Sequence, residues 1–198
     1  GNDDVDWRDI MAPHWAQTEK RMGEHKVVLC LQDTTELDFN GQDIEGRGRL
    51  NYAARRGMYV HPTYAVTPGR EPLGVVDAWM WARDAVYDPG QPAGPKESTR
   101  WIEGYERVAE MASRLPTSRL VYIADREADG VDLMQRAQAL GTPADWLIRA
   151  QHNRCLPAGE TLWSHICAGE PLGEIAFTMP SREGRKARTV RQHLWARR

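Results

Sequence analysis

Residues 120–130 read LVYIADREADG, and the change of character within this stretch decides the fold that the sequence predicts. An apolar run from Leu120 to Ala124 is followed directly by Asp125, and three of the next four residues are charged. A short apolar run with such a boundary is typical of a buried strand. The strand thus ends on a carboxylate, which either marks the point where the chain meets water or is held there for chemistry.

The segments on either side of this strand have helical periodicity. Upstream, a helix is predicted from Ser98 or Thr99, either of which can cap it, to a stop at Pro116. Its apolar stripe is formed by Trp101, Tyr105, Val108, Ala112 and Leu115. Downstream, DGVDLMQRAQAL (129–140) predicts a second helix that stops at Gly141, and residues 144–152 predict another strand.

Three further strands are predicted nearer the N-terminus. HKVVLCLQDTTELDFNG (25–41) begins as a continuous apolar run, which indicates a strand buried on both faces that becomes polar at Asp33. Residues 57–68 and 72–83 alternate around the turn TPGREP and predict a hairpin, and the Pro- and Gly-rich residues 87–95 predict a loop. A meander followed by a strand-helix-strand unit indicates an α/β mixed sheet flanked by helices.

The C-terminal residues have a different texture. Residues 156–198 predict a hairpin with the turn SREGRKA (181–187), an apolar strand before it and a basic arm after it. Residues 182–198 hold 7 bases and one acid, whereas residues 1–46 hold 11 acids and 4 bases. This asymmetry favours an anionic partner near the C-terminal end, with a solvated charged hairpin as the alternative. Because the chain ends inside the basic arm, we expect it to be a fragment.

Composition is that of an ordinary globular protein, with 41% hydrophobic residues, 27% charged residues and a net charge of −2. We expect neither a membrane span nor a signal peptide, because no apolar run is long enough and the N-terminus is acidic. The three cysteines form no CxxC pair, which fits a reducing compartment. These features predict a cytoplasmic protein.

Asp33 and Asp125 stand at equivalent places, each where a buried strand turns polar. If the two strands are parallel neighbours, the carboxylates meet at one edge of the sheet. Two such charges about 4 Å apart repel by roughly 4 kcal/mol, so they need a cation between them or one must be protonated. Oxygen ligands favour Mg²⁺ or Mn²⁺, which can activate water and stabilise the leaving oxygen of a phosphodiester. The alternative is that both residues merely cap turns or helices.

Six segments resemble the catalytic core of the DDE transposases of the insertion-sequence-four group, the relatives of the Tn-five transposase. They are LQDTTELDFNG, RRGMYVHPTYAVTP, WMWAR, KESTRWIEGYERV, YIADREADG and LIRAQHNR, and the match runs almost from Lys26 to the end. The sharpest motifs are QDTTELDF and ADREAD. The resemblance implies an RNase H-like core whose first and fourth strands carry two acids of a metal-binding triad. It makes Asp33 the first acid and Asp125 the second.

The third acid of this family is a glutamate within a Tyr-Arg-Glu-Lys signature that this sequence lacks. Tyr52 and Arg55 have the right spacing, but Tyr59 stands where the glutamate is required. The resemblance implies that a mostly β insertion precedes the glutamate helix, so the third ligand is expected downstream of Arg198. Of the nearby acids, we expect Asp129 to cap the following helix, Glu127 to favour its N-terminal end and Glu36 to point away from Asp33.

The resemblance implies three segments. Residues 1–24 are a lead-in left from a preceding domain, 25–155 are the RNase H-like core, and 156–198 begin the β-rich insertion. Basic residues after the last core strand and in the hairpin are candidates to bind DNA phosphates, with solvated charge as the alternative. They are Arg149, His152, Arg154, Arg185, Lys186 and Arg188.

The expected function is that of the catalytic core of a cut-and-paste DNA transposase, inactive as a fragment because one acid is missing. The resemblance further implies Mg²⁺ or Mn²⁺ as cofactor, double-stranded DNA at transposon ends and target as partner, and a homodimer in the intact protein. It also implies a bacterial, nucleoid-associated location with no membrane partner. Two alternatives stay open, an RNase H-like nuclease that uses an acid within this chain and a non-catalytic DNA-binding remnant.

Overall fold

The structure of this protein is a computed structural model that describes residues 5–52, 54–83 and 99–197. The chain divides into two compact units, residues 1–151 and residues 152–198. The loop predicted for residues 87–95 and the cap predicted at Ser98 lie outside the described residues. Within the described ranges, no helix is both long enough and apolar enough to cross a membrane.

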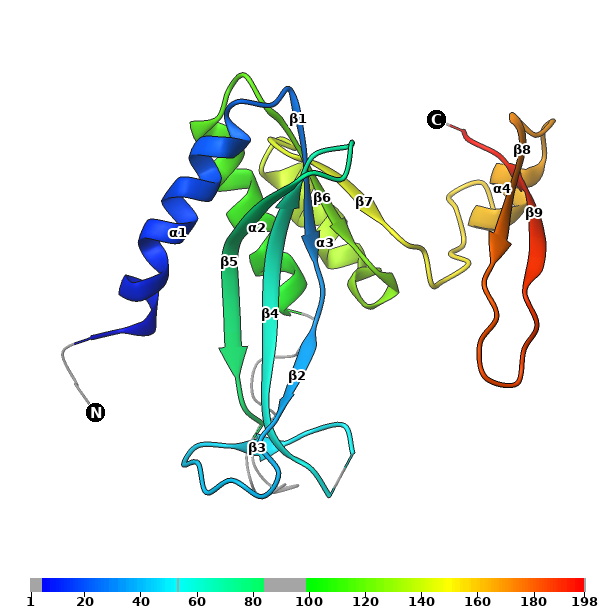
Figure 1. Ribbon diagram of the computed structural model, residues 1–198. Helices are drawn as coiled ribbons and strands as arrows, with labels where there is room; N and C mark the ends of the chain where they lie inside the picture. The colour runs from blue at the N-terminus through cyan, green and yellow to red at the C-terminus, as the bar shows by residue number, and fades with distance from the viewer. Residues whose placement is uncertain (1–4, 53, 84–98, 198) are drawn as a thin grey trace. The chain divides into compact units, whose positions relative to one another are not determined.

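The first unit is built on one mixed sheet (Figure 1). Its central antiparallel strand, β4 (Arg56–Val66), pairs with β5 (Pro72–Trp81) and with β1 (Val27–Gln32). Two short strands, β2 (Thr35–Asp38) and β3 (Gly48–Arg49), also pair with β4. On the other side of β1, β6 (Arg119–Ala124) and β7 (Asp145–Ile148) continue the sheet in parallel.

The spatial order β5-β4-β1-β6-β7 joins an antiparallel meander to a parallel strand-helix-strand unit. This is the RNase H-like arrangement, so the predicted fold class is confirmed. The hairpin of β4 and β5 and the strand at 119–124 also lie where the sequence places them.

Helices α2 (Thr99–Arg114) and α3 (Val131–Ala139) follow β5 and β6 in the chain, and α2 contacts β1, β6 and α3. Trp101, Tyr105 and Val108 of the predicted stripe are buried. Ala112 and Leu115 pack against the same core. The Tyr105 hydroxyl donates a hydrogen bond to the carbonyl oxygen of Ala144, 2.8 Å away, and so ties α2 to the start of β7.

The sequence pattern predicts no helix before residue 25, but α1 (Trp7–Met22) forms there and packs along β5 (Figure 1). Asp6 caps its start by accepting a hydrogen bond from the Arg8 amide. Met22 belongs to the same hydrophobic core as β1 and β6. The weak amphipathic signal has a physical reason, because only Thr18 and Met22 of this helix are buried.

Strand β1 is buried on one face, so the prediction of a strand buried on both faces is wrong. Val28, Cys30 and Gln32 are buried, whereas the intervening Leu31 is 37% exposed. The three helices contribute to the single core cluster that covers the Val28 and Cys30 face. The apolar run therefore reflects half-burial in a mixed sheet.

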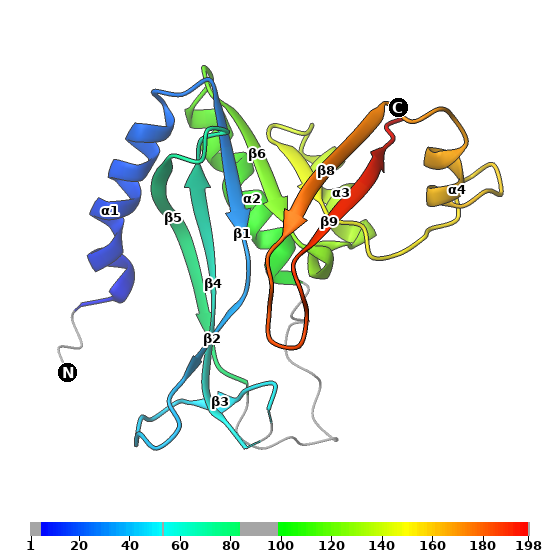
Figure 2. The same ribbon diagram turned by 45° about the vertical axis from the view of Figure 1, so that its right-hand side comes forward.

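The second unit contains the predicted hairpin, β8 (Gly173–Met179) and β9 (Arg188–Leu194), paired antiparallel from Gly173 opposite Leu194 to Met179 opposite Arg188 (Figure 2). A short helix that the sequence pattern does not predict, α4 (Leu162–Cys167), precedes it. Thr161 and Ser164 form a capping box at its start.

Candidate active site at the carboxyl edge of the sheet

The two candidate acids follow directly on paired positions of adjacent parallel strands. Gln32, the last residue of β1, lies beside Ala124, the last residue of β6. Asp33 and Asp125 are the next residues on the two strands. Because neighbouring strands lie about 4.8 Å apart, this register brings the two acids to the same edge of the sheet. The predicted placement at a common edge is confirmed.

Arg149 follows the neighbouring strand at the same level. Ile148 pairs with Ala124, and the Arg149 amide donates a hydrogen bond to the Ala124 carbonyl oxygen at 3.2 Å. Its side chain is exposed. The carboxyl ends of β1, β6 and β7 therefore present an acid, an acid and a cation in that order.

Each candidate acid is oriented by a backbone amide of its own turn. Oδ1 of Asp33 accepts a hydrogen bond from the Thr34 amide at 2.8 Å, and Oδ1 of Asp125 accepts one from the Glu127 amide at 2.7 Å. The second bond makes Asp125 the cap of a short 3-10 turn, Arg126–Ala128. For both acids, no donor among the described residues reaches the second carboxylate oxygen.

Asp129 does not have the predicted role at the start of α3. The N-cap residue of α3 is Gly130, which has no side chain to accept a hydrogen bond from the first amides of the helix. The buried Asp129 carboxylate instead accepts a hydrogen bond from the Gln151 amide at 2.6 Å, which joins the turn after β6 to the segment after β7. The aspartate that does act as a cap at this edge is Asp125, which caps the 3-10 turn Arg126–Ala128 and not α3.

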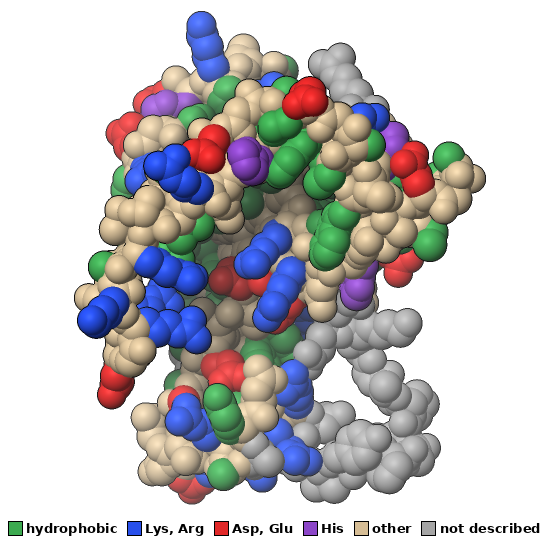
Figure 3. All heavy atoms as spheres, turned by 90° about the vertical axis from the view of Figure 1, so that its right-hand side faces the viewer, with side chains coloured by type: hydrophobic (Ala, Val, Ile, Leu, Met, Phe, Trp, Pro, Cys, Tyr) green, Lys and Arg blue, Asp and Glu red, His purple; other side chains and the backbone are tan. Residues whose placement is uncertain are grey.

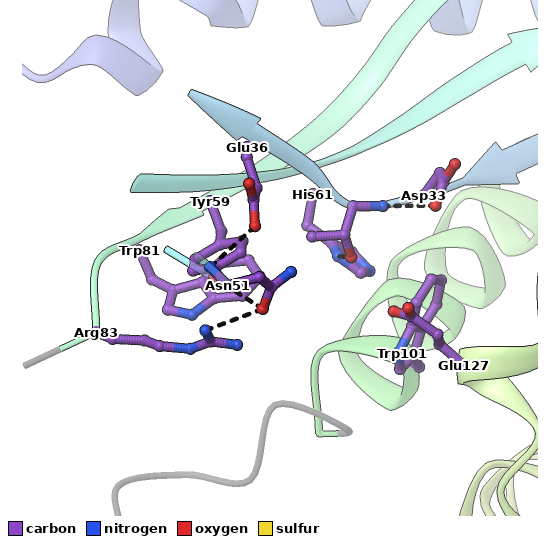
Figure 4. Close-up of a pocket in the computed structure, with 10 residues that line it drawn as sticks. Asp33, Glu36, Asn51, Tyr59, His61, Trp81, Arg83, Trp101 and Glu127 are labelled. Atoms are coloured by element: carbon purple, nitrogen blue, oxygen red, sulfur yellow. Dashed lines mark hydrogen bonds between the residues drawn. The ribbon is translucent and has the colours of Figure 1, made fainter. Parts of the chain in front are cut away.

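Asp33 opens onto a cavity of about 320 Å³ in the first unit (Figure 4). Glu36 and Glu127 also line it, whereas Asp125 is not among its described lining residues. In the pairing with β4, Glu36 lies opposite Tyr59 and faces the other side of the strand from Asp33, as expected. β1 ends at Gln32 and β2 begins at Thr35, but both keep one register against β4, so side chains continue to alternate across Asp33 and Thr34. The other lining residues are Thr34, Asn51, Tyr59, His61, Trp81, Arg83 and Trp101.

One side of the cavity is a polar network centred on Asn51 (Figure 4). The Asn51 backbone amide donates a hydrogen bond to the Glu36 carboxylate. The Asn51 side-chain oxygen accepts hydrogen bonds from the Tyr59 hydroxyl at 3.2 Å and from Arg83 at 3.1 Å. Tyr59 stacks on Trp81 with ring centroids 5.1 Å apart. One wall of the cavity is thus formed by Glu36, Asn51 and Tyr59, which are held by hydrogen bonds and by ring stacking.

His61 lies deeper in the same wall and is 2% exposed. Its Nδ1 shares a 2.7 Å hydrogen bond with the Thr34 hydroxyl, while Nε2 has no partner within the described residues. Desolvation, helped by the nearby positive charge of Arg100, lowers the pKa of His61 to about 4. The ring is therefore neutral at pH 7.

The donor atoms at the sheet edge fit a hard divalent cation in kind but supply only part of a ligand set. Asp33 and Asp125 offer carboxylate oxygens, which Mg²⁺ and Mn²⁺ prefer. Among the described residues, no group of three or more His, Cys, Asp or Glu side chains is arranged to hold a metal ion. Two carboxylates with one open oxygen each are what this edge provides.

The remaining candidate DNA-binding residues belong to the second unit: His152, Arg154, Arg185, Lys186 and Arg188. Arg185 pairs through its backbone with Arg182 across the tip of the hairpin, and Arg188 begins β9. On the face drawn in Figure 3, Lys and Arg side chains are interspersed with Asp and Glu. By sequence, the tip of the hairpin at residues 182–186 carries three bases and one acid.

Two solved structures are similar to this chain. A cryo-EM structure of the piggyBac transposase synaptic complex with hairpin DNA has a TM-score of 0.40 and 12% identity, over 86% of this chain and 32% of that chain. A crystal structure of a pre-cleavage Mos1 transpososome has a TM-score of 0.29 and 12% identity, over 81% of this chain and 49% of that chain. This chain thus spans about a third and about half of their lengths. No protein-family model matches the sequence.

Proposed function

We propose that this chain is a catalytic core fragment of a cut-and-paste DNA transposase of the insertion-sequence-four group. The observation that carries the proposal is the register of Gln32 with Ala124, which brings the acids of QDTTELDF and ADREAD to one edge of the sheet. An RNase H-like sheet with acids on its first and fourth core strands is the arrangement that the sequence resemblance implies. The activity is phosphodiester cleavage and strand transfer at transposon ends.

Asp33 and Asp125 would hold Mg²⁺ or Mn²⁺ through the carboxylate oxygens that their own turns leave open. When bound, such a cation activates the attacking oxygen and stabilises the leaving oxygen of a phosphodiester. The protein's own contribution is orientation, because each carboxylate is fixed by a backbone amide before any ligand arrives.

Double-stranded DNA is the proposed partner, and Arg149 is a cation positioned to meet it near the acids. Its exposed guanidinium leaves the strand next to that of Asp125. A phosphate held there would lie beside the carboxylates without being read for sequence. The basic residues of the second unit would add salt-sensitive contacts, and the intact protein would act as a homodimer.

With two acids the fragment should bind metal weakly and cleave nothing. A nuclease alternative is favoured by one observation, the presence of Glu36 and Glu127 in the cavity that Asp33 lines. If either carboxylate completes the ligand set, this chain nicks DNA by itself. A non-catalytic DNA-binding remnant is the further alternative, and it requires no metal at either aspartate.

Mn²⁺ titration of the purified chain, followed by electron paramagnetic resonance, tests the proposal. Asp33→Asn and Asp125→Asn should each weaken binding at least tenfold, whereas the control Asp9→Asn, an exposed acid of α1, should not. Equal Mn²⁺ binding by all four proteins would overturn the proposed site. Plasmid nicking by the wild type that is lost in Asp33→Asn would replace the transposase-fragment proposal with the nuclease.

A further inference from the structure

The chain that carries Asp33 crosses an interruption in the β-ladder. β1 pairs with β4 as far as Gln32 opposite Thr63, and β2 resumes at Thr35 opposite Val60. The same register places Asp33 opposite Pro62 and Thr34 opposite His61. Proline has no amide hydrogen to donate, so a regular ladder is weakened at this level. Asp33 therefore needs another means of being held in place.

A side-chain hydrogen bond between Thr34 and His61 connects the chain to β4 where the β-ladder is interrupted. The Thr34 hydroxyl and His61 Nδ1 are 2.7 Å apart, and this is the only hydrogen bond that the His61 ring makes within the described residues. The ring itself is fixed by burial and by an edge contact with Trp101, with centroids 4.3 Å apart. Figure 4 shows His61 between the Asn51 network and the Trp101 side of the cavity. Thr34 is thus anchored to a buried ring.

Thr34 passes this constraint on to the carboxylate. Its backbone amide donates the 2.8 Å hydrogen bond to Oδ1 of Asp33. His61, Thr34 and Asp33 therefore form a chain of two hydrogen bonds that runs from a buried ring to the exposed candidate ligand. If the Thr34 hydroxyl were free, both the peptide and its amide could turn away from Asp33.

We propose that His61 is a positioning residue for Asp33, acting through Thr34 and touching neither metal nor DNA. The role rests on the proposed function, since it serves the carboxylate that would bind the cation. Partners outside the immediate ligand shell of a metal typically change metal affinity by about 10- to 100-fold when they are removed. The low end applies here, because the Thr34 and His61 variants leave the Asp33 carboxylate in place.

Paired variants separate the hydrogen bond from packing. Thr34→Val removes the hydroxyl at nearly constant shape, Thr34→Ser keeps it, and Thr35→Val makes the same change at the exposed neighbour. His61→Asn can present an amide nitrogen near the position of Nδ1, whereas His61→Phe fills the space without a hydrogen bond. A cooperative thermal unfolding transition establishes that a variant is folded. If the variants of the buried His61 do not fold, Thr34→Val alone still tests the hydrogen bond.

Mn²⁺ affinity of the full chain and the Asp33 χ1 couplings in NMR are the two measurements. Thr34→Val and His61→Phe should each weaken Mn²⁺ binding about tenfold and average the χ1 couplings, and combining them should add little. Thr34→Ser, Thr35→Val and His61→Asn should stay close to the wild type. A Thr34→Val protein with unchanged χ1 couplings and affinity, in a series where Asp33→Asn loses Mn²⁺, overturns the positioning role alone. Unchanged binding in Asp33→Asn refutes the proposed function, and the χ1 couplings still decide whether His61 orients Asp33.

Discussion

The Tyr122 hydroxyl donates a hydrogen bond to the side-chain oxygen of Gln32 and thereby joins the two strands that end at the candidate acids. Both residues are buried, and the same hydroxyl lies 3.2 Å from the carbonyl oxygen of Trp101 in α2. Desolvation raises the pKa of Tyr122, so the phenol remains a donor. The strand ends are thus cross-linked within the core, one residue before Asp33 and three before Asp125.

Gly104→Ala should disturb this link from the helix side. A Cβ atom at Gly104 would lie 2.1 Å from the Gln32 side-chain oxygen, which burial prevents from moving aside. Although alanine favours a helix, overpacking should dominate and lower the free energy of unfolding by about 1–3 kcal/mol. Urea denaturation measures the change.

Gly130→Ala is the control for steric clash alone, because the nearest atom to its new Cβ is 4.0 Å away and its cost should be limited to the lower N-cap preference of alanine at the start of α3. Adding Gln32→Ala to Gly104→Ala should recover part of the lost stability, since the clashing atoms are then absent. A Gly104→Ala protein as stable as the wild type would show that Gln32 does not pack as described.

The sequence predicted where the strands end and which strands pair, but not the contacts between side chains of neighbouring strands. The abrupt change from Ala124 to Asp125 marks the true end of β6, and the parallel pairing of β1 with β6 follows from the order of strands and helices. These features depend on local patterns and on connection rules, which a single sequence carries.

Features set by cross-strand neighbours were not predictable in the same way. The break at Asp33 and Thr34 depends on Pro62 and His61, which are distant in sequence and meet it only through the register of β4. Pro62 inside an alternating segment was the available signal, because proline disfavours a regular central ladder. Glu36 faces the cavity beside Tyr59 because the register continues unchanged across that break.

The three cysteines should differ sharply in reactivity. Cys30 is fully buried in β1, and desolvation raises the pKa of its thiol to about 12, whereas Cys155 and Cys167 are exposed. A thiolate is the reactive species, so a disulfide reagent should label the two exposed thiols quickly and Cys30 only after unfolding. Each cysteine that reacts releases one thiol from the reagent, so counting this product in native buffer and in guanidinium measures how many cysteines react. Cys30→Ser should remove only the slow thiol, and fast labelling of all three in the native wild type would contradict the burial of β1.

The bond between α1 and α2 should contribute modestly to stability. Arg114 donates two hydrogen bonds to the Glu19 carboxylate, at 2.7 and 2.8 Å, and this contact lowers the pKa of Glu19. Because the pair is partly exposed, a double-mutant cycle with Glu19→Gln and Arg114→Gln should give a coupling of about 0.5–1 kcal/mol. The coupling should fall in 1 M salt and disappear as the pH drops through the lowered pKa of Glu19.

The exposed pair of Arg107 and Glu110, 3.0 Å apart within α2, is the control. Its coupling should be about 0.3 kcal/mol, since neighbours on one helix constrain little that the helix does not already fix. Equal couplings for the two pairs would show that Glu19 and Arg114 do not fasten α1 to the core.

Acid should destabilise the first unit through His61. Its pKa is about 4 in the folded protein and near 6.5 when unfolded, so between these values the unfolded chain binds more protons. Stability should therefore fall as the pH drops from about 6.5 towards 4, by roughly 3 kcal/mol, since one pKa unit corresponds to about 1.4 kcal/mol. The charged groups around the ring are Arg100 of α2 and the cavity residues Asp33, Glu36, Arg83 and Glu127.

Comparing urea denaturation of the wild type and His61→Asn across this range isolates the effect, because every other titrating group is common to both proteins. The variant should lose stability less steeply between pH 6.5 and 4, and the two curves should run parallel above pH 7. Asp77 works in the opposite direction, since desolvation raises the pKa of its carboxyl, but it does so equally in both proteins. Identical slopes would mean that His61 is protonated as readily in the folded state as in the unfolded one, and hence that the ring is not enclosed between Thr34 and Trp101.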